Sequence, residues 1–429
     1  MMAEKAGRLE EGARIQAENA MNNGTQGIGK RVEPGEKRAE PWENDGGRVD
    51  TVTEVRLSAQ EAGLTATETL AHEAAKRFCG QEDYCLEDCG GGTNNTTGLL
   101  TSGGKKYMLR LYNTHEEREK AEFEHRLLEA LGRLAPGLPF GVPQPAEGAA
   151  GTSLIRLAGG KLAAMFRYLD GVTPDFGRPA QAEAFGRAAG ELSRALERLE
   201  QQEQLEAAGL DLPAYPPYYA LASAHPSCGL DEVSRFCGEP PEEFAGCREA
   251  LLVLGRQLEE LAPVLDGLAV LPHQLIHGDL NASNALVAGD GEIAALLDFE
   301  FVTRDLRAME PAVCLWGLLP EAGADAAGTA QTWACLKAFW RGFAAVRLLS
   351  AEERRVIPEL MQLRSLDVFL HFLGRYRDGV DDASMLLRQI PDTASRLEQV
   401  ERHRRELEAL LELQEEALDK SVLRHSTDG

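Results

Sequence analysis

The sequence contains few basic residues for its length. Its 429 residues include 45 lysines and arginines against 69 aspartates and glutamates, which leaves a net charge of −24. Proteins that bind nucleic acid neutralise its phosphates with a basic face, and anionic membranes attract basic segments. The composition therefore argues against nucleic acid and against an anionic membrane surface as partners.

The sequence also lacks the patterns of zinc-binding, secreted and membrane-spanning proteins. Its eight cysteines form no C-x-x-C pair, and no Cys/His cluster has the spacing of zinc ligands. No apolar run approaches the length of about 18 residues that crosses a bilayer, and residues 1–20 hold no apolar core of a signal peptide. We therefore expect a cytoplasmic protein with reduced, free thiols.

The sequence divides into regions of different composition and hydrophobic pattern. Residues 1–55 are rich in Glu, Gly, Asn and Lys and cannot bury enough apolar surface to offset the entropy of ordering, so we expect a disordered tail. Residues 64–170 contain short strands, including a hairpin predicted over 97–112 that turns at two consecutive glycines. Helical patterns dominate residues 171–395, and residues 396–429 form a C-terminal helix and tail. The sequence thus predicts an α+β protein with a small β-rich half and a larger helical half.

Two local patterns in the β-rich region bear on a possible site. Thr114 followed by Glu117 has the spacing of a capping box and predicts the start of a helix. In the strand predicted over 106–112, Lys106 and Arg110 lie on one face because side chains alternate along a strand.

The C-terminal region carries apolar residues at helical spacing over 397–418. Arg404 and Gln414 interrupt this stripe, so packing against the helical half is favoured over a coiled-coil dimer. Three tryptophans in helical patterns are interpreted as core residues and not as part of a substrate site: Trp316, Trp333 and Trp340.

The segment most informative about chemistry is 275–300, LIHGDLNASNALVAGDGEIAALLDFE. It places His277 two residues before Asp279, Asn284 five residues after it, and Asp298 at the start of D-F-E. We expect a hairpin around the G-D-G turn to bring Asp298 back beside this loop. The loop carries the other two oxygen-bearing side chains, Asp279 and Asn284. Two such side chains, with nucleotide phosphates, suffice to hold Mg²⁺, and the third can accept the proton of an attacking hydroxyl. The segment therefore predicts phosphoryl transfer.

This segment resembles that of the aminoglycoside/choline kinase-like phosphotransferase superfamily, whose bilobal fold is similar to that of protein kinases. In that superfamily H-G-D replaces the H-R-D of protein kinases, and D-F-E-like triplets replace D-F-G. The resemblance implies a small β-rich N-terminal lobe and a larger helical C-terminal lobe. It also implies that Asp279 is the catalytic base and that His277 supports the loop from within. Asn284 and Asp298 would then bind Mg²⁺.

The resemblance further implies an ATP site in the N-terminal lobe. Gly91, Gly92 and Asn94 fall in the loop that covers the nucleotide phosphates, where backbone N–H groups can face an anion. Tyr168 falls in the hinge between the lobes, whose backbone would bind the adenine edge.

Arg110 stands at the position of the family's nucleotide-binding lysine, and Lys106 on the same face is its rival. A guanidinium can chelate phosphate oxygens, and some branches of the superfamily carry Arg there, including ones similar to the second type of homoserine kinase. Glu124 matches the carboxylate of the family's F-E-x-x-L-L-x-x-L helix, which would pair with Arg110.

Together the motifs predict ATP- and Mg²⁺-dependent transfer of the γ-phosphoryl group to a hydroxyl of a small molecule such as an aminoglycoside, homoserine or choline. Two alternatives stay open. One is an atypical Ser/Thr protein kinase of the same fold, which the missing A-P-E motif disfavours; the other is a nucleotide-binding protein without turnover.

The acceptor and two acidic residues stay unassigned by motif. Homoserine would need a basic group for its carboxylate, and three arginines of the helical half are available: Arg341, Arg364 and Arg375. Asp305 and Glu310 follow the D-F-E triplet, and we expect them to form structural salt bridges or to cap a helix.

Overall fold

The computed structural model describes residues 65–91, 95–113, 117–134, 137–201, 215–319 and 326–413. The described residues form two compact units. The sheet unit comprises residues 65–113 and 147–165, and the helical unit comprises residues 117–146 and 166–413. The predicted tail at 1–55 lies outside the described residues.

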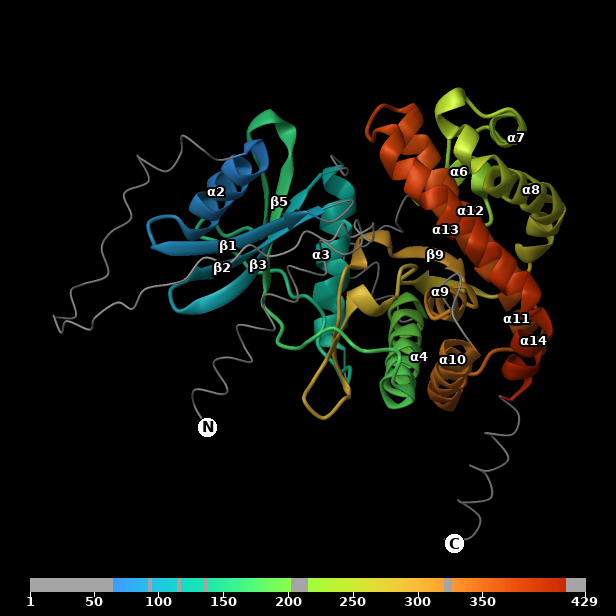
Figure 1. Ribbon diagram of the computed structural model, residues 1–429. Helices are drawn as coiled ribbons and strands as arrows, with labels where there is room; N and C mark the ends of the chain where they lie inside the picture. Colours follow the sequence, from blue (N-terminus) through green and yellow to red (C-terminus); the bar gives the residue numbers. More distant parts are fainter. Residues whose placement is uncertain are drawn as a thin grey trace, which may run out of the picture. The chain divides into compact units, whose positions relative to one another are not determined.

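The sheet unit contains one helix and an antiparallel sheet of five strands in the order β1-β2-β3-β5-β4. Figure 1 shows helix α2 lying along β1. The bounds are α2 (Ala66–Cys79), β1 (Tyr84–Gly91), β2 (Asn95–Ser102), β3 (Lys105–Tyr112), β4 (Leu154–Arg156) and β5 (Leu162–Arg167), with a short 3₁₀ helix η2 (Ala158–Gly160) between the last two strands. The hairpin predicted over 97–112 is therefore confirmed as β2 and β3.

Strand β1 extends into the glycine-rich segment that the sequence places in the loop over the nucleotide phosphates. The strand extends through Gly90 and Gly91, which pair with Thr97 and Thr96 of β2. The register shifts between Glu87 and Gly90, where two residues of β1 oppose one residue of β2, as in a β-bulge. Consecutive glycines leave no hydrophobic pattern in the sequence, so the backbone pairing alone shows where β1 ends.

The helical unit contains most of the helices and two small antiparallel strand pairs, β6–β9 and β7–β8. Its helices are α3 (Arg118–Arg133), α4 (Pro179–Gln201), α6 (Leu221–Ala224), α7 (Leu230–Gly238), α8 (Arg248–Leu268), α9 (Met309–Gly317), α10 (Ala326–Val346), α11 (Ala351–Arg355), α12 (Ile357–Arg377), α13 (Ala383–Arg402) and α14 (Arg404–Glu412). Its strands are β6 (His273–Ile276), β7 (Ala285–Val287), β8 (Ile293–Leu296) and β9 (Thr303–Leu306), and its 3₁₀ helices are η3 (Glu242–Cys247), η4 (Ala282–Asn284) and η5 (Phe299–Phe301).

The capping box predicted at the start of α3 is wrong. The helix begins at Arg118 with Glu117 as its N-cap residue, so Glu117 cannot occupy the third helical position that a capping box requires. Thr114 lies outside the described residues. A charged first turn and an apolar stripe are compatible with several starting points, and the sequence alone does not choose between them.

The C-terminal stripe packs on the helical unit, as predicted. Helix α13 lies beside α12, and the shorter α14 contacts α11 (Figure 1). Leu397, Val400, Leu407 and Leu411 are all buried there. The chain bends at His403, next to the interruption that the sequence places at Arg404. In the described part of the chain, no helix combines the length and apolar character needed to cross a bilayer.

Candidate active site

The loop of residues 277–284 follows β6 and carries the H-x-D-x-x-x-x-N motif. It turns at Gly278, whose φ of 79° favours glycine. A Cβ atom on Gly278 would lie 3.1 Å from the hydroxyl oxygen of Tyr218, and that hydroxyl donates to the Gly278 carbonyl over 2.9 Å. The loop ends in η4, where the Asn281 side chain accepts a 2.9 Å hydrogen bond from the Ser283 N–H. Glycine at this turn therefore lets the loop approach Tyr218.

His277 is fully buried and is held in one tautomer. Its Nε2 lies 2.9 Å from the carbonyl oxygen of Leu297, which can only accept, so Nε2 carries the proton. Its Nδ1 accepts a 3.3 Å hydrogen bond from the Asp279 N–H, and its ring packs edge-on against Phe299 with 4.6 Å between centroids. Burial lowers the pKa of His277 to about 4. The neutral ring therefore ties the D-F-E segment to the loop without titrating near pH 7.

The Asp279 carboxylate lies between two donors. Its Oδ1 accepts a 2.5 Å bond from Arg364 Nη2, and its Oδ2 accepts a 3.1 Å bond from Asn284 Nδ2. Burial raises the pKa of Asp279 to about 6; the charge of Asp298 also raises it, whereas Arg364 and Asn284 lower it. The group is therefore an anion at pH 7 that can still take up a proton, which suits a general base.

The hairpin of β7 and β8 brings Asp298 beside Asn284. The Leu297 N–H donates to the Asn284 carbonyl over 2.9 Å. Asp298 has a φ of 62°, the one positive φ among the non-glycine residues that the structure describes. Asn284 Nδ2 donates to the Asp279 carbonyl over 2.8 Å as well as to its carboxylate, so the amide oxygen of Asn284 keeps its acceptor capacity. An amide oxygen and a carboxylate are ligands that Mg²⁺ accepts, and this donor set fits the cation.

Arg364 on α12 belongs to the site although it lies 85 residues beyond Asp279 in the sequence. Its Nη1 binds Asp367 Oδ2 at 2.8 Å and lies 3.4 Å from the Tyr218 hydroxyl. The guanidinium carbon lies 5.7 Å from the ring centroids of both Tyr218 and Trp316, within range of cation–π attraction. Sequence reasoning named Arg364 as an available cation but did not connect it to Asp279, because no local spacing links the two residues.

The residues around Arg364 change the interpretation of Trp316, and they add Asp367 and His225 to the candidate site. Trp316 is partly exposed and stacks on Arg364 and Arg396, so the interpretation of Trp316 as a core residue is wrong. Trp333 is also partly exposed and packs edge-on against His403, so its interpretation as a core residue is wrong as well, whereas Trp340 is buried, as predicted. On the far side of the guanidinium, His225 Nε2 lies 2.9 Å from Asp367 Oδ1. These contacts fix Asp367 and Arg364 together.

Asp305 and Glu310 support the site in a different way from the one predicted. Each accepts a hydrogen bond from the backbone instead of forming a salt bridge or capping a helix. Glu310 Oε2 accepts a 2.6 Å bond from the His277 N–H, and Asp305 Oδ2 accepts a 2.5 Å bond from the Tyr218 N–H. Burial raises the pKa of both groups to about 7. The two residues therefore hold the start of the 277–284 loop and the backbone of Tyr218.

The residues predicted to bind the nucleotide are distributed over both units. Gly91 ends β1 and Arg110 is buried in β3, both in the sheet unit. Glu124 is buried in α3, and Tyr168 follows β5; burial raises the pKa of the Tyr168 phenol. Gly92 and Asn94 lie outside the described residues. Lys106, the rival of Arg110, is exposed in β3.

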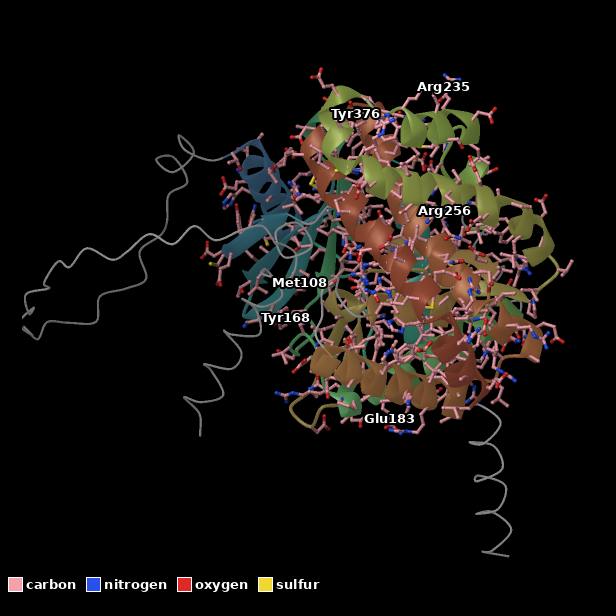
Figure 2. All side chains as sticks on the ribbon, turned by 45° about the vertical axis from the view of Figure 1, so that its right-hand side comes forward. Met108, Tyr168, Glu183, Arg235, Arg256 and Tyr376 are labelled. Atoms are coloured by element: carbon pink, nitrogen blue, oxygen red, sulfur yellow. The ribbon has the colours of Figure 1, made fainter. Side chains whose placement is uncertain are left out.

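The other two arginines considered for an acceptor carboxylate bind carboxylates elsewhere. Arg341 pairs with Glu183, which lies at the edge of the helical unit in Figure 2. Arg375 contacts both oxygens of Asp381, at 2.6 and 2.8 Å. Of these arginines, Arg364 alone contacts Asp279 in the part of the chain that is described.

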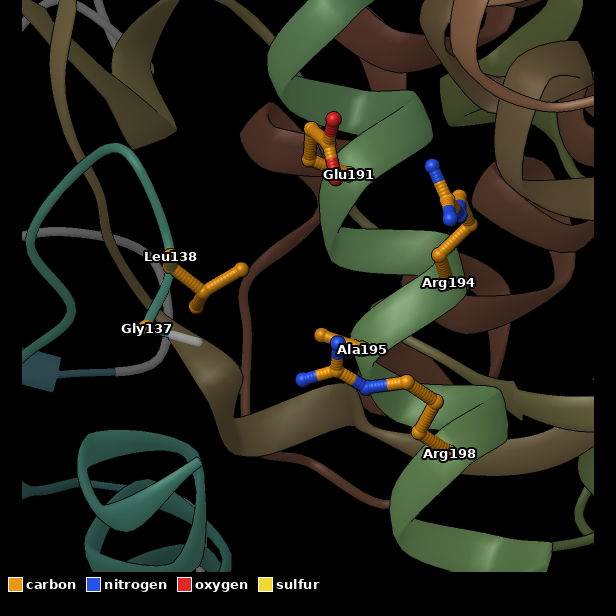
Figure 3. Close-up of a pocket in the computed structure, with 6 residues that line it drawn as sticks. All are labelled: Gly137, Leu138, Glu191, Arg194, Ala195 and Arg198. Carbon is orange, nitrogen blue, oxygen red and sulfur yellow. The ribbon is translucent and has the colours of Figure 1, made fainter. Parts of the chain in front are cut away.

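A cavity beside α4 does not involve the residues around Asp279 and Arg364. It has a volume of about 230 Å³, and Figure 3 shows two arginines and a glutamate of α4 at its edge. Its lining residues are Gly137, Leu138, Glu191, Arg194, Ala195 and Arg198. None of them belongs to the 277–284 loop or to the residues that contact Arg364.

The fold and the loop identify the class of protein. A model of the phosphotransferase enzyme family, APH, matches residues 86–349, and the chain belongs to this family. The recognition of the superfamily from the sequence and the predicted fold class are confirmed. The chain is a phosphotransferase with an alcohol group as acceptor, as expected.

Several known proteins and solved structures are similar to this chain. A homoserine kinase of Rhodopseudomonas palustris is 29% identical over 279 residues, which cover 65% of this chain and 76% of that protein. Among solved structures, a microcompartment-associated aminopropanol kinase has a TM-score of 0.54 at 18% identity, over 80% of this chain and 98% of its own. An amicoumacin kinase in complex with AMP-PNP and Ca²⁺ has a TM-score of 0.53 at 16% identity, over 77% and 93% of the two chains. The two solved structures confirm the fold.

Proposed function

We propose that this chain transfers the γ-phosphoryl group of ATP to a hydroxyl of a small molecule, with Asp279 as the base. The proposal rests on one observation: Asp279, Asn284 and Asp298 lie close together at the 277–284 loop. Hydrogen-bond donors hold both carboxylate oxygens of Asp279. The acceptor hydroxyl would give its proton to Asp279 as its oxygen bonds to the γ-phosphorus. The bond from the γ-phosphorus to the bridging oxygen then breaks, and ADP leaves.

Asn284 and Asp298 would hold Mg²⁺ through their oxygens, and the bound ion would neutralise charge on the nucleotide phosphates. His277 is a positioning residue in this proposal because its neutral ring and its backbone N–H fix the loop. Support for the donor comes from the amicoumacin kinase, whose solved structure is a complex with AMP-PNP and Ca²⁺. By the family resemblance, the nucleotide would be contacted by Gly91, Gly92, Asn94, Arg110, Glu124 and Tyr168.

Homoserine is the first acceptor to test, since homoserine kinases are among the curated relatives. The test measures ATP consumption with Mg²⁺ across a panel of homoserine, aminopropanol, choline, aminoglycosides, sugars and a generic protein. We expect turnover with a small hydroxyl compound and a loss of about 10³-fold or more in Asp279→Asn, which cannot accept the proton.

Two results would contradict this proposal. Phosphorylation of the protein substrate alone would favour an atypical protein kinase. ATP binding without turnover on any acceptor, and without an effect of Asp279→Asn, would favour a nucleotide-binding protein that lacks catalysis.

A further inference from the structure

Arg364 lies where an acceptor must bind if the proposed function holds. The reacting hydroxyl would bind the Asp279 carboxylate, and Arg364 Nη2 is 2.5 Å from Oδ1 of that carboxylate. A hydroxyl oxygen hydrogen-bonded to the carboxylate at about 2.7 Å therefore stands within roughly 5 Å of the guanidinium. A substituent a few bonds from the hydroxyl then falls within contact range of Arg364.

The position of the guanidinium does not depend on Asp279 alone. Asp367 holds Nη1 at 2.8 Å, and the aromatic rings of Tyr218 and Trp316 are both within 5.7 Å of the guanidinium carbon. Asp367 is in turn fixed by His225. When an acceptor takes over the Asp279 carboxylate, these contacts keep Arg364 beside it.

Arg364 also has hydrogen-bonding capacity left. A guanidinium carries five N–H donors, two of them on Nη2. Among the described residues, Nη2 has a single acceptor, Asp279, and the buried Nε has none. The group can therefore donate to a further anion without releasing Asp367.

The remaining N–H donors of Arg364 suit an anionic group on the acceptor. An ammonium group next to the reacting hydroxyl would face a permanently charged guanidinium, whereas a carboxylate there would gain a charge-assisted hydrogen bond. We propose that Arg364 binds a carboxylate of the acceptor, a few bonds from the reacting hydroxyl, and contacts Asp279 when no acceptor is bound. This inference depends on the proposed function, and it names the acceptor class as hydroxy acids or hydroxy amino acids.

The test compares L-homoserine with L-homoserinamide, in which a neutral amide replaces the carboxylate. Both acceptors are assayed with the wild type, Arg364→Gln, Arg364→Lys and Arg375→Gln. We expect the wild type to prefer homoserine in kcat/KM, and Arg364→Gln to lower that preference by about 100-fold, mainly through KM. Arg364→Lys should restore part of the preference because it keeps the charge. Arg375→Gln removes a paired arginine of the same helix that does not contact Asp279, and it should leave the preference unchanged.

A purely structural role for Arg364 predicts a different result, namely an equal loss of kcat/KM for both acceptors. That result, or a wild type without preference for the carboxylate, would overturn the inference while leaving the proposed function intact. Calorimetric titration of both compounds in the presence of AMP-PNP and Mg²⁺ separates the two proposals. Carboxylate-dependent binding that is lost in Arg364→Gln, without turnover of any acceptor of the panel, would support a carboxylate site at Arg364 and contradict the proposed function. If neither compound binds the wild type, the inference is wrong.

Discussion

At the scale of single residues, the site is stabilised by carboxyl groups that contact backbone. Glu310 is fully buried, and its Oε2 accepts the N–H of His277, the first residue of the 277–284 loop. Asp305 anchors Tyr218 in the same way, and Tyr218 in turn contacts Gly278 and Arg364. These carboxyl groups keep the loop backbone satisfied where water does not reach it.

The buried carboxyl of Glu310 makes stability depend on pH. Burial raises its pKa to about 7 from an ordinary value of 4.5, so the folded protein holds a proton that the unfolded chain releases between these values. Stability from this group is present below about pH 4.5, falls as the pH rises, and levels off above about pH 7. We expect the free energy of unfolding of the wild type, relative to Glu310→Gln, to fall by about 3 kcal/mol between pH 4.5 and pH 8.

Urea unfolding of the wild type and Glu310→Gln at several pH values checks this prediction. Glu243→Gln is a suitable control, because Glu243 is exposed and lies outside the site. Parallel pH curves for the wild type and Glu310→Gln would contradict it.

At the scale of elements, two helices pack so closely that glycine is required at their contact. Gly186 of α4 faces α10, and Gly342 of α10 faces α4. A Cβ atom at Gly186 would collide with the carbonyl oxygen of Phe339, and one at Gly342 with that of Glu183. Backbone atoms of a helix cannot move aside as a flexible side chain can, so this contact admits no larger residue.

The contact between α4 and α10 predicts opposite effects for two glycine-to-alanine substitutions in helices. Gly186→Ala should destabilise the protein by about 3 kcal/mol or more, because the methyl group meets backbone. Gly267→Ala, in α8, should stabilise it by up to about 1 kcal/mol, because a Cβ there meets no atom within 4 Å and alanine favours helix. Thermal unfolding of both variants is the measurement. Equal melting temperatures for Gly186→Ala and the wild type would show that α4 and α10 can separate without cost.

At the scale of the whole molecule, the acidic composition opposes compactness. A net charge of −24 creates self-repulsion that is greater in the folded chain than in the expanded one. Ion pairs with a buried partner, such as partly buried Arg307 with buried Glu353, are screened less by salt than the long-range repulsion is.

We therefore expect stability to rise with ionic strength. The midpoint of urea unfolding should increase as NaCl goes from about 0.01 M to about 0.15 M, over which the Debye length shortens from about 30 Å to about 8 Å. KCl should act equally, since screening does not depend on which monovalent salt is used. A midpoint that falls with salt would mean that surface ion pairs outweigh the repulsion.

The sequence by itself determined the class of fold and pointed to the central residues of the candidate site. The β2–β3 hairpin and the packing of the C-terminal stripe follow from local patterns of apolar residues and turn glycines, and these patterns act over a few residues. Asp279, Asn284 and Asp298 were found in the same way, because a short loop and one hairpin join them. The family match over residues 86–349 confirms the family that these residues indicate, whereas the role of each of the three residues stays a prediction.

Only the tertiary structure decided which distant side chains surround Asp279. Arg364 and Tyr218 lie 85 and about 60 residues from the loop, and helix packing rather than spacing brings them there. The start of α3 and the extent of β1 were also outside the reach of the sequence, since charged first turns and glycine pairs are compatible with several boundaries. Residues that lie close along the chain leave a readable spacing, whereas contacts between distant segments depend on how whole helices pack.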